Sequence, residues 1–138
     1  MSFNVRDQDL RKTRALPSAA STTVDGAAID LGQTTNGRLV ADFDFELVAP
    51  AVNATMAPDT RTFTYSVITS ANSDLSSPTV VNSGIIVQTG AGGAGAATAT
   101  AKFRLPSSTT ARYVGVRVVS GASTADASSV SAVLSVLV

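Results

Sequence analysis

The sequence predicts an all-β fold, a β-sandwich or jelly roll of seven or eight antiparallel strands with an extended N-terminal arm. Apolar and polar residues alternate in seven segments after residue 21, and no helical period appears there. Turn-forming residues separate these segments, and Val, Thr, Ala, Ser and Gly dominate the 138 residues, a composition that suits short strands and polar turns. The length fits one domain, so we divide the chain into an arm, residues 1–21, and a single sandwich, residues 22–138.

The first 21 residues are predicted to lie outside the core. They are rich in charge, and Pro17 would end any helix that Asp7 and Arg11 begin. Phe3 to Val5 could instead supply an eighth, edge strand. Deleting residues 1–16 is therefore expected to leave a folded β-domain. We assign contact with a partner to the clustered cations of this arm, with a mobile, solvated tail as the alternative: Arg6, Arg11, Lys12 and Arg14.

The first strands are predicted over residues 22–32 and 39–48. Asp25-Gly26 marks a turn or bulge within the first segment, and Asn36-Gly37 marks a turn before the second. The second segment, "LVADFDFELV", alternates most clearly in the chain. Its apolar residues share one face and its acids share the other, which indicates a strand with one buried side.

Five further strands follow, over residues 61–69, 79–89, 97–105, 111–121 and 129–138. Gly84 predicts a bulge or break inside 79–89. The run "GAGGAGAA", residues 90–97, is expected to form a flexible loop tip. A phosphate-binding loop is the alternative, but such a loop needs a following helix, and the pattern after residue 97 is that of a strand.

The composition removes most catalytic chemistry. The chain has no cysteine and no histidine, so thiolate sites, disulfides and the commonest general base are excluded. Ten basic and ten acidic residues balance, which does not indicate a nucleic-acid partner. The charged start predicts no signal peptide or membrane anchor, hence synthesis in the cytoplasm. We expect a protein that is not an enzyme, with no catalytic residue, metal or cofactor.

Three acids on alternate positions, Asp42, Asp44 and Glu46, allow three interpretations. Their spacing overlaps that of the carboxyl pair in inverting glycosidases, and their oxygens could also surround a calcium ion. We favour a solvated sheet face, on which the acids pair across strands with Lys102 and Arg104.

Arg117 is a lone cation within "YVGVRVVSG". The favoured interpretation is that its side chain extends along the sheet face toward water, and contact with another chain is the alternative.

Two stretches carry a resemblance to a known family. Residues 112–138, "RYVGVRVVSGASTADASSVSAVLSVLV", place an aromatic-Val-Gly strand, a Ser-Gly loop and a last Val/Leu strand in succession. The opening has a polar leader, a Ser/Ala/Thr-rich patch and "AIDLG" at residues 28–32. Together they resemble the jelly-roll capsid cement, or decoration, proteins of tailed bacteriophages, such as the one on the Bordetella phage head.

The resemblance implies a structural virion protein on the capsid exterior. Such a protein would bind the major capsid protein and brace contacts between capsomers, as a homodimer at capsid two-fold positions. A phage tail or host-recognition β-module is the alternative function, and a hydrolase that uses only Asp42, Asp44 or Glu46 is a third hypothesis. Heat protection of phage heads, glycan binding and loss of activity on replacing the acids would distinguish the three.

Overall fold

The structure, a computed structural model, describes residues 6–32, 34–35, 38–39, 43–105 and 110–137. These residues form ten β-strands and no helix. The strands are β1 Arg6–Ala15, β2 Thr23–Asp30, β3 Thr34–Thr35, β4 Arg38–Leu39, β5 Phe43–Ala49, β6 Thr62–Ser70, β7 Thr79–Thr89, β8 Ala99–Leu105, β9 Tyr113–Ser120 and β10 Ser131–Leu137.

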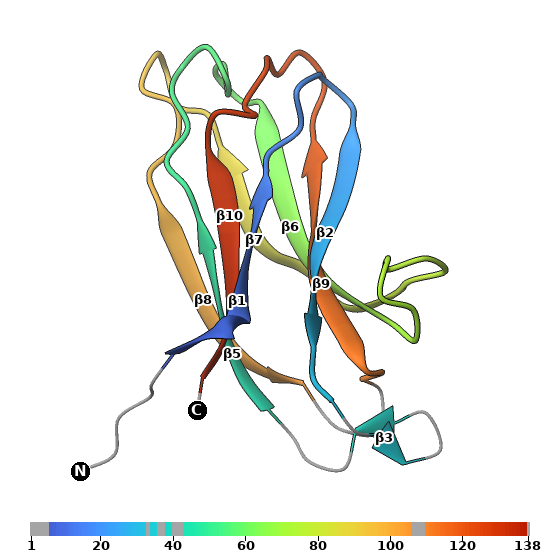
Figure 1. Cartoon of the computed structure of the whole chain (residues 1–138). Coiled ribbons are helices and arrows are strands. Elements are labelled where there is room, and N and C mark those ends of the chain that lie inside the picture. Colours follow the sequence, from blue (N-terminus) through green and yellow to red (C-terminus); the bar gives the residue numbers. More distant parts are fainter. Residues whose placement is uncertain (1–5, 33, 36–37, 40–42, 106–109, 138) are drawn as a thin grey trace, which may run out of the picture.

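Eight of the strands build two four-stranded antiparallel sheets that face each other (Figure 1). We call the sheet with order β1-β10-β5-β8 sheet A and the sheet with order β2-β9-β6-β7 sheet B. The first long strand pairs with the last, the second with the seventh, the third with the sixth and the fourth with the fifth. This nested pairing is the jelly-roll arrangement, and it confirms the predicted fold class.

The seven predicted strand segments all form long strands, with ends that differ by a few residues. The short strands β3 and β4 pair on either side of Asn36-Gly37, whose turn lies outside the described residues. Two predicted irregularities are confirmed as bulges. The register of β2 against β9 shifts after Gly26, and the register of β7 against β6 shifts around Gly84.

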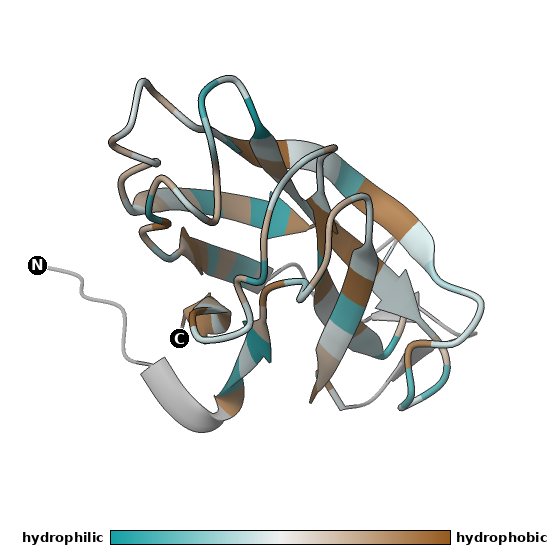
Figure 2. Ribbon diagram, turned by 90° about the horizontal axis from the view of Figure 1, so that it is seen from above, coloured by the Kyte–Doolittle hydropathy of each residue, from teal (hydrophilic) through white to brown (hydrophobic). Residues whose placement is uncertain are grey.

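The core lies between the two sheets and follows the alternation in the sequence. On β5, Phe45 and Leu47 are fully buried, while Asp44 lies on the opposite face. Figure 2 shows the same alternation of hydrophobic and hydrophilic residues along the strands. At the edge of sheet A the ring of Phe103 stacks on Phe45, with centroids 5.5 Å apart and planes 9° apart, which extends the core to β8.

The predicted N-terminal arm contains a strand of the sandwich. Residues 6–15 form β1, which pairs with β10 at the edge of sheet A, and Leu16 is buried with 2% of its surface exposed. The next residues are also held, because the hydroxyl of Ser120 donates to the carbonyl of Ala19 and accepts from the N–H of Thr22. Deleting residues 1–16 would therefore remove a strand of sheet A, which contradicts the expectation that the shortened chain keeps a folded β-domain.

The glycine-rich loop between β7 and β8 is fixed by hydrogen bonds rather than free. Val52 and Ala96 exchange two backbone hydrogen bonds, and the N–H of Gly92 donates to the carboxylate of Asp59. A Cβ atom on Gly95 would lie 2.0 Å from the carbonyl oxygen of Val52. Glycine is required there because the two chain segments approach too closely for any side chain.

A polar network is buried beside this loop. The hydroxyl of Tyr65 donates to the side-chain oxygen of Gln88 at 2.6 Å. The amide nitrogen of Gln88 donates to the carbonyls of Pro50 and Ala97, at 2.7 and 3.0 Å. Gln88 thereby connects β7 with the end of β5 and the start of β8. Burial raises the pKa of Tyr65, so its phenol stays protonated and remains a donor.

Candidate functional site

The acids of β5 pair with the cations of β8, as the favoured interpretation predicts. The register places Asp44 opposite Arg104 and Glu46 opposite Lys102. Arg104 donates two hydrogen bonds to Asp44, at 2.7 and 3.2 Å, and the Lys102 ammonium lies 3.9 Å from the Glu46 carboxylate. These contacts confirm cross-strand pairing for two of the three acids. Asp42 lies outside the described residues.

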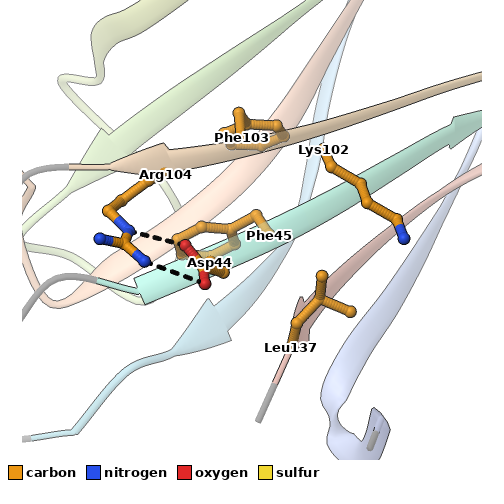
Figure 3. Close-up of a pocket in the computed structure, with 6 residues that line it drawn as sticks. All are labelled: Asp44, Phe45, Lys102, Phe103, Arg104 and Leu137. Carbon is orange, nitrogen blue, oxygen red and sulfur yellow. Dashed lines mark hydrogen bonds and ion pairs between the residues drawn. The ribbon is translucent and has the colours of Figure 1, made fainter. Parts of the chain in front are cut away.

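These pairs lie in shallow depressions on the outer face of sheet A. One, of about 310 Å³, includes Asp44, Lys102, Arg104 and Leu137, and Figure 3 shows the Arg104 guanidinium facing the Asp44 carboxylate. The hydrogen bonds from Arg104 hold the pKa of Asp44 below its usual value. An ionised carboxylate held by a guanidinium is a poor proton donor, which is the role that an acid catalyst would need.

A second depression lies on the same outer face of sheet A, beside the first. It measures about 260 Å³ and includes Arg11 of β1 and Glu46, which has only 6% of its surface exposed. Over the residues that the structure describes, no group of three or more carboxylates could hold a metal ion. The outer face of sheet A is thus a surface of charged pairs with two shallow hollows.

Arg117 forms an ion pair that the sequence did not reveal. It donates two hydrogen bonds to Asp25 on the neighbouring strand β2, at 2.7 and 2.9 Å, and these contacts raise the pKa of the guanidinium. About a quarter of each side chain is exposed. Neither sequence-based interpretation of Arg117 named Asp25 as its partner, because only the order of the strands brings β2 beside β9.

A similar pair joins Arg112 to Asp30 at the end of the same two strands. Arg112 donates two hydrogen bonds to the carboxylate and lies 5.3 Å from the ring centre of Tyr113. The pKa of Asp30 is lowered first by Arg112 and then by the backbone N–H of Gly32. Arg112, just before β9, and Arg117, within β9, are therefore each paired with a carboxylate of the same chain.

The four cations assigned to partner contact are distributed over two faces of β1. The structure describes the backbone of Arg6, which pairs with Leu137, but not its side chain. Arg11 lies opposite Ser135, on the outer face of sheet A, and is exposed. Lys12 and Arg14 lie opposite Leu134 and Ala132, whose side chains belong to the core.

Lys12 and Arg14 consequently project toward the gap between β1 and β2, the edge strands on one side of the sandwich. The Arg14 side chain packs over Gly26 of β2, with its Cδ 3.5 Å from where a Cβ atom would lie. Its Nε is buried without a hydrogen-bond partner. Inward-pointing charge of this kind is one way in which edge strands avoid unwanted pairing.

The described cations fall into two groups. Lys102, Arg104, Arg112 and Arg117 each form an ion pair within the chain. Among the side chains that the structure describes, which exclude those of Asp7 and Asp9, no carboxylate forms an ion pair with the other group, which consists of Arg11, Lys12, Arg14 and Arg61. Three of these four belong to β1, so this edge strand concentrates the cations that lack an internal counterpart.

Comparisons with protein-family models, curated proteins and solved structures found no match. Along the described part of the chain, no helix is long and apolar enough to cross a membrane.

Proposed function

We propose that this chain is a structural virion protein that binds the outer surface of an assembled phage capsid. It contacts the major capsid protein, stabilises contacts between capsomers, and acts as a symmetric dimer over two-fold positions. The observation that carries this proposal is the concentration of cations without internal partners on β1. Such charge on one edge of a rigid sandwich suits a partner that presents carboxylates.

The jelly-roll fold and the resemblance at both ends of the sequence support the same function. A protein that binds only the assembled shell stabilises that shell by mass action. Two copies in one dimer would multiply a weak contact, because the second contact forms at a high effective concentration. A modest electrostatic contact per chain is therefore sufficient.

Co-sedimentation with intact heads of the encoding phage tests the proposal. The wild-type chain should pellet with heads, raise the temperature at which they release DNA, and dissociate as salt increases, because salt screens exposed charges. A chain that never pellets with heads at low salt would refute the function.

Charge substitutions then test the contact surface. The double variant Arg11→Gln, Lys12→Gln keeps β1 but removes one exposed and one half-buried cation, and its affinity should fall by up to about tenfold, because a charge at a protein surface contributes up to about 1 kcal/mol. Arg61→Gln is the matched control, since Arg61 is exposed and unpaired but lies in the loop before β6. Equal binding by the double variant and the control would exclude β1 as the contact.

A further inference from the structure

The four edge strands of the sandwich differ in how they are protected against pairing with another chain. The edges are β1 and β8 in sheet A and β2 and β7 in sheet B. Natural edge strands usually carry charges, bulges or inward-pointing cations. β1, β2 and β8 each carry at least two charged residues, whereas β7, "TVVNSGIIVQT", carries none.

β7 also carries the large hydrophobic side chains that are exposed in the described part of the chain. The two large hydrophobic side chains that are exposed there are Val80, at 41%, and Val87, at 54%, and both belong to β7. The first half of the strand is distorted by register shifts between Val80 and Ile86. Bulges protect an edge by twisting it, so that half is a poor template for another strand.

The second half of β7 has no such distortion. Ile86 to Thr89 pair with Tyr65 to Thr62 without a register shift, and Val87 lies on the outer face of sheet B, opposite Thr64. This short segment is regular, uncharged and contains the most exposed valine. Among the described edges of the sandwich, it alone combines these properties.

We propose that Val87 marks a self-pairing edge, at which β7 adds antiparallel to β7 of a second copy of this chain. A two-fold axis at Val87 sets Val87 against its own copy and Ile85 against Thr89, so no charges meet. The resulting sheet would be continuous through eight strands. The same operation on β8 about Phe103 would set Lys102 against Arg104 of the other copy, and like charges that face each other destabilise a strand pair.

Pairing through β7 would form the symmetric dimer of the proposed function. The place of that dimer at a capsid two-fold position rests on the proposed function. Its test needs no capsid, so the two ideas can fail separately. A dimer that does not bind heads would refute only the function. A monomer that binds heads would refute the pairing and the dimer, and would leave the contact with the capsid standing.

Light scattering across a dilution series measures the association of the purified full chain. The wild type should reach the mass of two chains, and Val87→Lys should dimerise at least about tenfold more weakly because two ammonium groups would face each other. Val80→Lys is the matched control, since it adds the same charge to an exposed valine in the distorted half. A wild type that is monomeric throughout, or equal effects of the two substitutions, would overturn the proposal.

Cross-linking provides a second measurement that does not depend on tolerance of a lysine. The chain has no cysteine, so Val87→Cys places one thiol per chain at the proposed axis. Directly opposed Cβ atoms in an antiparallel pair lie about 4.5–5.5 Å apart, close to the span of a disulfide. Mild oxidation should link Val87→Cys into dimers and leave Val80→Cys largely unlinked. Equal or faster linking of Val80→Cys would contradict the register.

Discussion

Removal of the Gln88 side-chain amide should destabilise this protein strongly for a polar residue, because the amide is buried and connects β6, the end of β5 and the start of β8 through hydrogen bonds. Gln88 is 4% exposed and takes part in three hydrogen bonds, one from Tyr65 and two to the carbonyls of Pro50 and Ala97. Gln88→Leu preserves the approximate size and removes all three hydrogen bonds, and it leaves the buried Tyr65 hydroxyl without an acceptor. Each buried polar group without a partner costs about 1–3 kcal/mol.

The expected loss follows from these contacts. The buried Tyr65 hydroxyl loses its acceptor at a cost of about 1–3 kcal/mol, and the loss of the part-buried bonds to Pro50 and Ala97 costs about 0.5–1.5 kcal/mol each. The leucine regains part of this by burying apolar surface. We therefore expect Gln88→Leu to lower the free energy of unfolding by about 2–4 kcal/mol, a large share of a typical domain's stability. Tyr65→Phe leaves only the Gln88 oxygen unsatisfied and should cost about 1–2 kcal/mol.

A double-mutant cycle separates this network from a general loss of packing. In the double variant neither the phenol nor the Gln88 oxygen remains to be satisfied, so its cost should be about 1–2 kcal/mol smaller than the sum of the single costs. Urea unfolding followed by circular dichroism gives each free energy, and an unchanged m-value verifies that the same surface unfolds. The reasoning fails if Gln88→Leu lies within about 0.5 kcal/mol of the wild type or if the two costs add.

Three further outcomes are expected. Burial raises the pKa of Tyr65, so the unfolded chain releases this proton first. The contribution of Tyr65 to stability should be level below about pH 10 and should fall above it by up to about 1.4 kcal/mol per pH unit, and a Tyr65→Phe variant with an equal slope above about pH 10 would contradict this. Gly95→Ala should destabilise the protein by at least about 2 kcal/mol in urea unfolding, and by more than Gly93→Ala, because both glycines have positive φ but only Gly95 also lacks room for a Cβ atom. In carboxyl-detected NMR titrations the pKa of Asp44 should lie below its usual value in the wild type and return toward it in Arg104→Gln, whereas an unmoved pKa would mean that Arg104 does not cause the shift.

The sequence alone identified seven of the eight long strands, because the alternation of apolar and polar residues is a local signal. A period of two in residues 39–48 and 61–69 reports which face of each strand meets the core, whatever strand lies beside it. The bulges at Gly26 and Gly84 were also predictable, because glycine inside an alternating segment is a local signal. The pairing of Asp44 and Glu46 with β8 was predicted only as a match of opposite charges.

The N-terminal segment shows where local signals end. Residues 6–15 carry four cations in place of an apolar face, so their composition indicates an exposed arm. They are nevertheless a strand, because β10 offers a free edge and the backbone hydrogen bonds of an edge strand do not require apolar side chains on both faces.

Strand order belongs to the tertiary structure alone. Nothing in the alternation of β2 or β9 states that the two are neighbours, and so Arg117 could not be matched with Asp25 by sequence reasoning. The separation of the β1 cations onto two faces, and the position of uncharged β7 at an edge, likewise follow from which strands pair. Periodicity records each strand's own two faces, whereas its edges are set by contacts between residues far apart in the chain.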